Sequence, residues 1–256
     1  MIEIIKFNTE TKYLIIASFF IAFAISFNEW GNETFNFFLG LFNLLKAFII
    51  SLFVLSISLY FQKKFAEEHG INIQYSLWFI QDVRKKEFGI LTRTRFPSIP
   101  IGIILLLLST FYGLYKSGIF FLAVGGFSIL SINKNARLQR RFKTTSEREI
   151  SQIALRGPFS LLVIAIISTL LIKVHPVFLE TAKISAWLAI FNMLPFPNLD
   201  GSKMFFYERL QYVFWLVLIV LTASLILLTK TAIIPIIIAI IAALFITVYY
   251  GIKRFG

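Results

Sequence analysis

Two polar side chains, Asn192 and Asp200, stand at the end of a long apolar run, in the stretch FNMLPFPNLDG (191–201). Ionisable groups at membrane depth are costly, so a carboxylate in such a setting is a candidate functional residue. Asp200 could bind a metal or a substrate, or it could pair with Lys203 three residues later. A purely structural role, ending a helix through turn chemistry and side-chain hydrogen bonds, is the other interpretation.

The elements that must position these residues are apolar segments. The chain has 256 residues, of which 58% are hydrophobic and 15% charged, whereas soluble domains carry about 25% charged residues. Most of the apolar runs match the length of about 20 residues that a spanning helix needs. The runs cover 13–28, 43–61, 98–130, 157–174, 184–199, 211–229 and 231–251. We therefore expect an all-α polytopic membrane protein with about six transmembrane helices in a single membrane domain, 1–256.

The basic residues predict an orientation. Lys and Arg near the ends of spans favour the cytoplasm, and most of the 25 in this chain fall in 62–97, in 131–156 and near the two chain ends. The segment 29–42 carries Glu29 and Glu33 but no Lys or Arg, which is typical of an outer loop. We expect a cell-membrane protein with both termini in the cytoplasm. The net charge of +12 then reflects topology and not nucleic-acid binding.

This orientation requires segment 98–130 to cross the membrane an even number of times. Prolines open the segment, Lys116-Ser117-Gly118 interrupts it, and Gly125-Gly126 lies near its end. A membrane-dipping hairpin and two short spans would both satisfy the requirement. Residues 71–79 alternate apolar and polar side chains, which predicts a strand in a small cytoplasmic β-hairpin. Ser146 and Glu149 have the spacing of a capping box, which predicts a helix start.

The stretch 191–201 resembles the Asn-x-x-Pro-x-x-x-Leu-Asp-Gly motif of the site-2 protease family of intramembrane zinc metalloproteases. The matching residues are Asn192, Pro195, Leu199, Asp200 and Gly201. Residues 153–166 are similar to the family's Gly-Pro-led helix through Gly157 and Pro158, and residues 95–108 and 118–127 are similar to its membrane-dipping region. The resemblance covers 43–210. It leaves 1–42 as an extra N-terminal helix with an outer loop, and 211–256 as two C-terminal helices.

The resemblance implies that Asp200 is the third ligand of a zinc ion. In that family a His-Glu-x-x-His motif on an earlier helix supplies the other two ligands and the general base. This chain lacks the motif, and the best register places Leu55, Ser56 and Leu59 near the expected His, Glu and His positions. The Gly-Pro-led helix also has Leu161 where the family usually carries an asparagine. The resemblance therefore indicates a degenerate site, with no catalytic residue.

The two histidines of the chain, His69 and His175, do not replace the motif. The predicted topology separates them by about 30 Å of hydrocarbon, so they cannot share a metal. Asp200 is then the only matching zinc ligand, and we expect no metal and no other cofactor.

We therefore expect a binding or regulatory module for membrane segments that is not an enzyme. Its partners would be the lipid bilayer and a client helix or extended segment, which could add to the edge of the strand at 71–79. Two alternatives remain. One is an active zinc endopeptidase that uses Asp200 with Glu67, Glu68 or His69. The other is a transporter or channel with Lys46, Asn192 and Asp200 along its path.

Overall fold

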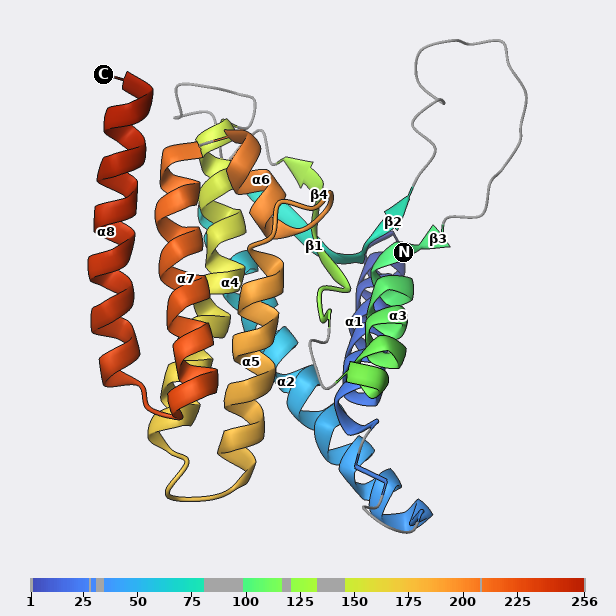
Figure 1. Cartoon of the computed structure of the whole chain (residues 1–256). Helices are drawn as coiled ribbons and strands as arrows, with labels where there is room; N and C mark the ends of the chain where they lie inside the picture. The colour runs from blue at the N-terminus through green and yellow to red at the C-terminus, as the bar shows by residue number, and fades with distance from the viewer. Residues whose placement is uncertain are drawn as a thin grey trace.

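A computed structural model describes residues 2–27, 29–30, 35–80, 99–116, 121–132, 146–207 and 209–255. These residues form eight helices and four strands (Figure 1). The helices are α1 (Ile2–Ser26), α2 (Phe37–Glu68), α3 (Ile101–Lys116), α4 (Glu147–Leu170), α5 (Val177–Asn192), α6 (Asp200–Tyr207), α7 (Arg209–Thr229) and α8 (Ile233–Phe255). The strands are β1 (Ile71–Leu77), β2 (Phe79–Ile80), β3 (Ile99–Pro100) and β4 (Gly125–Ile132).

The predicted all-α polytopic class is confirmed. Five of the helices, α1, α2, α4, α7 and α8, are long and apolar enough to cross a membrane. The sequence predicted about six, and the difference lies in α5. This helix packs along α4 but has only 16 residues, or about 24 Å at 1.5 Å per residue.

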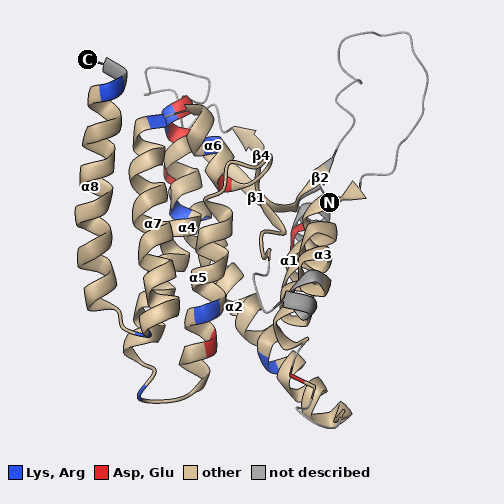
Figure 2. Cartoon of the chain, viewed as in Figure 1, with Lys and Arg blue, Asp and Glu red and all other residues tan. Residues whose placement is uncertain are grey.

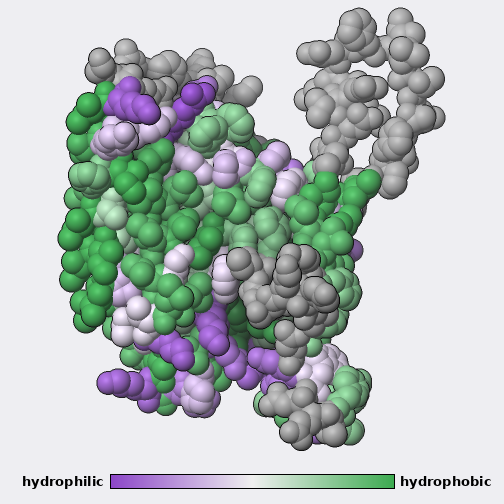
Figure 3. Space-filling model, viewed as in Figure 1, coloured by the Kyte–Doolittle hydropathy of each residue, from purple (hydrophilic) through white to green (hydrophobic). Residues whose placement is uncertain are grey.

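The helices form two groups with the strands between them. Figure 1 shows α4, α5, α7 and α8 on one side and α1 with α3 on the other, while α2 runs behind and contacts both groups. The face over α7 and α8 is hydrophobic, and hydrophilic residues gather toward the two ends of the molecule (Figure 3). Some Lys and Arg lie at helix ends, such as the start of α7 and the end of α8, and others lie within α2, α4 and α5 (Figure 2). This distribution is typical of a multi-pass membrane protein.

The strand predicted at 71–79 is present as β1, but its main partner is not its neighbour in sequence. β1 pairs antiparallel with β4, in a register that sets Tyr75 opposite Phe127. The apolar residues of β1 are buried in alternation with its polar ones. The expected small hairpin is thus a two-stranded sheet whose second strand comes from the end of segment 98–130. β2 and β3 form a second, two-residue pair.

Segment 98–130 returns to its starting point, as the orientation requires. The Trp78 carbonyl accepts a hydrogen bond from Gly102 N at 3.4 Å, and Trp78 N donates to the Val124 carbonyl at 3.0 Å. The outgoing part is helix α3, and the return ends in strand β4. Within the described residues, the segment is therefore one short helix followed by a strand, and not two helices.

Helix α4 has the predicted capping box, in which Ser146 N donates to Glu149 Oε2 at 3.0 Å. Gly157 and Pro158 lie in its interior and not at its start. The Gly-Pro pair therefore does not lead this helix, although it does place a residue without a side chain beside α2, where Ser58 Oγ donates to the Gly157 carbonyl at 3.2 Å.

Candidate functional site

The candidate site is a small buried cavity of about 20 Å³ where α2, α5, the start of α6 and the β1–β4 sheet meet. Polar groups from four elements line it. They are Ser58, Gln62, Tyr75, Asn192 and Asp200. A cavity needs roughly 10–15 Å³ to hold one water molecule, so this one has room for a water but not for a peptide substrate.

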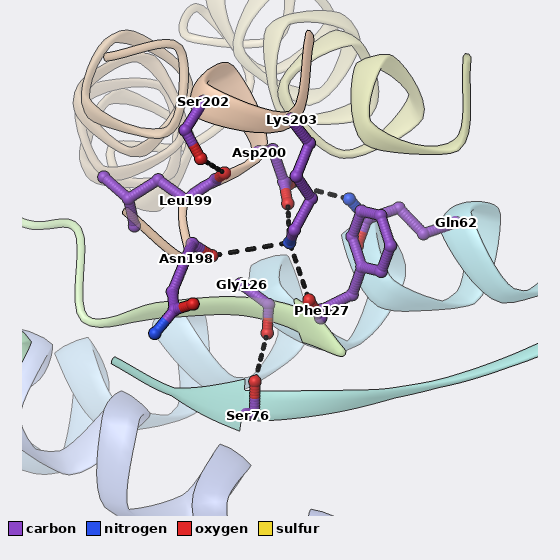
Figure 4. A network of polar contacts seen from close by, with 9 residues as sticks. All are labelled: Gln62, Ser76, Gly126, Phe127, Asn198, Leu199, Asp200, Ser202 and Lys203. Atoms are coloured by element: carbon purple, nitrogen blue, oxygen red, sulfur yellow. Dashed lines mark hydrogen bonds and ion pairs between the residues drawn. The ribbon is translucent and has the colours of Figure 1, made fainter. Parts of the chain in front are cut away.

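Asp200 is the centre of the site. Its side chain begins α6 and is nearly buried, with a residue exposure of 3%. Gln62 Nε2 donates a hydrogen bond to Asp200 Oδ2 at 2.7 Å, across 138 residues of sequence. Lys203 Nζ lies 3.7 Å from Asp200 Oδ1. The carboxylate therefore has an amide donor on one side and a cation on the other (Figure 4).

Lys203 is fixed by several contacts besides Asp200. Its ammonium donates to the Phe127 carbonyl at 2.6 Å and to the Asn198 carbonyl at 3.4 Å. It also lies 3.7 Å from the centroid of the Phe127 ring, a cation–π distance. Because Phe127 belongs to β4 and Asn198 to the loop before α6, the lysine ties the sheet to the helix that carries Asp200 (Figure 4).

Two glycines make the network sterically feasible. A Cβ at Gly157 would collide with Gln62 Nε2 and would lie 2.6 Å from Asp200 Oδ2. A Cβ at Gly126 would collide with the Asn198 carbonyl and would lie 3.3 Å from Asp200 Oδ1. Both positions therefore exclude side chains so that α4 and β4 can approach the carboxylate.

Burial and the neighbouring cation act on Asp200 in opposite directions. Burial raises the pKa of the Asp200 carboxyl above its ordinary value, while the Lys203 ammonium and the Gln62 amide lower it. Burial lowers the pKa of Lys203, and Asp200 raises it. Burial also raises the pKa of Tyr75, so its phenol stays neutral. The charge on Asp200 thus depends on Lys203 and Gln62.

Four of the five matching residues in 191–201 are buried, and one is exposed. Asn192 and Asp200 line the same cavity. Leu199 is fully buried, and a Cβ at Gly201 would collide with the Met193 carbonyl. Pro195 is exposed in the loop between α5 and α6. The motif therefore brings its two polar residues together, while the others shape the turn that presents Asp200.

The three positions predicted for the lost His-Glu-x-x-His motif do not share one environment. Leu55 and Leu59 line the cavity, whereas Ser56 is exposed on another face of α2. Ser58 and Gln62, four residues apart, both line the cavity, and Gln62 contacts Asp200. A register three residues later, with Ser58, Leu59 and Gln62, fits the geometry of α2 better.

The residues around Asp200 do not fit a zinc ion. Within the described part of the chain there is no group of three or more His, Cys, Asp or Glu side chains arranged to hold a metal. Gln62 directs its Nε2 donor toward the carboxylate, and the Lys203 ammonium lies 3.7 Å from it. A donor and a cation both repel a second cation at this position.

The residues proposed for unorthodox ligation lie elsewhere. Glu67 and Glu68 are exposed, and His69, which follows the last residue of α2, has its Nδ1 2.9 Å from the Phe65 carbonyl. His69 lies beside Arg156 in the first half of α4, while His175 follows the far end of that helix. The stretch of α4 from Arg156 to Leu170 alone spans about 21 Å, so the two histidines are apart, as the topology predicted.

Lys46 is not part of the site. Its ammonium pairs with Glu180 of α5 at 2.7 Å. Lys46 precedes Gln62 by sixteen residues on α2, which is about 24 Å along a helix. Lys46 therefore does not share the cavity that Asn192 and Asp200 line.

Two residues that make important contacts near the site were not identified from the sequence. Gln62 is one, and its spacing of four from Ser58 in an apolar segment was the available signal. Glu10 of α1 is the other: its carboxylate accepts from Tyr75 N at 3.3 Å and pairs with Lys63 at 2.7 Å. Glu10 therefore joins α1 to α2 and to the outer edge of β1.

Comparison with known proteins adds no assignment. No family model matches the chain, and neither a curated protein nor a solved structure is significantly similar to it.

Proposed function

We propose that this protein is a non-proteolytic, site-2-protease-like membrane protein that binds membrane segments of a client. The observation that carries the proposal is the contact set of Asp200. A catalytic zinc site needs three protein ligands and an open coordination position. The Gln62 amide and the Lys203 ammonium lie beside the Asp200 carboxylate, where a zinc ion would have to bind.

The reaction would also lack a base. Leu59 follows Ser58 in the register that fits the cavity, so an apolar side chain stands where a catalytic glutamate would be. Zinc-dependent hydrolysis requires an activated water beside the scissile carbonyl. A cavity of about 20 Å³ cannot hold that carbonyl as well.

A second, larger cavity supports the binding role. It has a volume of about 540 Å³ and lies against the β1–β4 sheet, within the range of about 300–1,000 Å³ that is usual for ligand sites. Tyr13, Trp78 and Phe127 contribute aromatic rings to it, and Gln74 and Asn198 contribute amides. This mixture suits an extended segment with apolar side chains and a polar backbone.

The edge of β1 is only partly available to such a segment. Glu10 occupies the outward amide of Tyr75. On the other strand, Lys203 occupies the outward carbonyl of Phe127. A client would therefore lie in the larger cavity beside Gln74 and Ser76 and would not extend the sheet along its whole length.

The orientation is part of the proposal. Several basic residues of the described chain lie at helix ends on the side of the molecule that carries α6, such as the start of α7 and the end of α8 (Figure 2). By the positive-inside rule this side faces the cytoplasm of the cell membrane. A fluorescent protein fused after Gly256 should fold and fluoresce, because this orientation places that end in the cytoplasm. A reporter that is active only outside the cytoplasm should be active when it is inserted after Lys230.

Site-specific photo-crosslinking in intact cells tests client binding. A photoreactive residue at Gln74, in the larger cavity, should give adducts with membrane proteins. The same residue at Leu228, which is 79% exposed on α7, is the matched control for lipid-facing positions. Equal adduct patterns at the two positions would contradict the proposal.

A further inference from the structure

A third cavity lies away from Asp200, among the ends of three helices. It has a volume of about 500 Å³ and is formed by the end of α2, the first half of α4 and the start of α7. The residues that matter for its chemistry are His69, Gln152, Arg156, Phe159, Gln211 and Trp215. None of them belongs to the Asp200 site.

The lining changes from polar to aromatic along the helix axes. His69 follows the last residue of α2, and Gln152 and Gln211 lie in the first two turns of α4 and α7. Phe159 and Trp215 lie deeper, about 10 Å and 6 Å further along their helices. One end of the cavity is therefore at the helix termini and the other is within the apolar part of the bundle.

Arg156 supplies the charge. Its guanidinium lies 4.3 Å from the centroid of the Phe65 ring, and the residue is exposed. Side chains on a helix point toward its N-terminus, which here means toward the polar end of the cavity. Among the described residues that line the cavity, none is Asp or Glu. An arginine in such a setting is a binding group for a phosphate.

Gln211 supplies a second polar group. Its Oε1 is buried and has no hydrogen-bond partner among the described residues. A buried acceptor without a partner is costly, so the amide gains from turning toward a donor. A headgroup hydroxyl beside the phosphate would supply that donor.

We propose that this cavity binds an anionic phospholipid that carries a headgroup hydroxyl, with its phosphate at Arg156 and its first acyl carbons against Phe159 and Trp215. Basic pockets between membrane helices are a known mode of headgroup recognition, and tryptophan is common at headgroup level. The inference does not depend on the proposed client binding, because it uses different residues.

Native mass spectrometry of the full chain in detergent tests this assignment. Phosphatidylglycerol should bind about tenfold more tightly than phosphatidylcholine, a difference of about 1.4 kcal/mol. The soluble ester sn-glycerol 3-phosphate should bind much more weakly than the lipid, because it lacks contacts with Phe159 and Trp215. Equal affinity for the two lipids, or for the lipid and the soluble ester, would overturn the proposal.

Two variants and a control locate the site. Arg156→Gln should lower the affinity for phosphatidylglycerol about tenfold. Arg209→Gln, a basic residue outside the cavity that lies 5.7 Å from the Phe205 ring, should change it less than about twofold. Gln211→Leu removes a buried unpaired acceptor and should therefore fold, yet bind phosphatidylglycerol more weakly. Equal losses in Arg156→Gln and Arg209→Gln, or no loss in Gln211→Leu, would contradict the assignment.

Discussion

Asp200 is held by one partner that is near in sequence and one that is far. Lys203 lies three residues away, so the sequence alone made it a candidate partner, and its ammonium lies 3.7 Å from Asp200 Oδ1. Gln62 lies 138 residues away, and its contact depends on how α2 and α6 each pack against α4. Local spacing predicts the first kind of contact but not the second, because helix rotation is set by tertiary packing.

The first prediction concerns the Gln62–Asp200 hydrogen bond. Gln62→Leu should lower the free energy of unfolding by about 1.5–3 kcal/mol, the range for a bond to a charged group. In an Asp200→Leu background the same change should cost much less, because no carboxylate remains to be left unpaired. Thermal unfolding in detergent of the four proteins measures the coupling. Additive effects would show that the two side chains do not interact.

The second prediction concerns the charge of Asp200. Lys203→Met removes the cation that lowers the pKa of this carboxyl. Burial then acts with less opposition, so the pKa should rise and the protonated form should persist to higher pH than in the parent protein. Infrared difference spectra would follow the stretch of the protonated carboxyl during a pH titration. Asp200→Asn identifies the band, and an unchanged midpoint in Lys203→Met would contradict the ion pair.

The third prediction uses two glycines with different surroundings. Gly157→Ala should destabilise the protein, because the new Cβ would collide with Gln62 Nε2 in the centre of the network. Gly251→Ala in α8 is the matched control. Its Cβ would meet only Leu210 Cδ1 at 3.8 Å, and alanine favours a helix over glycine by about 1 kcal/mol. Unfolding temperatures should move in opposite directions for the two variants, and equal shifts would argue against the crowding at Gly157.

At the scale of elements, the helices were easier to predict than the sheet. Runs of about 20 apolar residues predict spans directly, and alternation at 71–79 predicted β1. β4 was not predicted, because its first residues continue the apolar run of 98–130. Its strand conformation depends on pairing with β1 and on the close approach that Gly125 and Gly126 permit.

The fourth prediction tests the return of segment 98–130 to β1. The chain has no cysteine, so Ile73→Cys with Ile129→Cys introduces a single pair at positions that face each other in the sheet. Cα atoms in such pairs are about 4.5–5.5 Å apart, within reach of a disulfide. Mild oxidation should link the pair, as thiol blocking and mass analysis would show. Ile73→Cys with Ser131→Cys, offset along β4, should link poorly, and equal linking would contradict the register.

At the scale of the whole molecule, the structure combines a membrane-protein architecture with a polar site that is closed around its own side chains. The small cavity beside Asp200 has room for about one water molecule. The two larger cavities lie against the sheet and among the ends of α2, α4 and α7. The proposed binding functions therefore belong to these larger cavities, while the Asp200 network holds α2, β4 and α6 together.

We propose that Gln62 and Lys203 occupy the place that a metal ion would take beside Asp200. The most direct test is the zinc content of the full chain, purified from zinc-supplemented cells and measured by mass spectrometry of the metal. We predict a content far below one zinc per chain, and no further decrease in Asp200→Ala. About one zinc per chain in the parent protein that is lost in Asp200→Ala would contradict the claim.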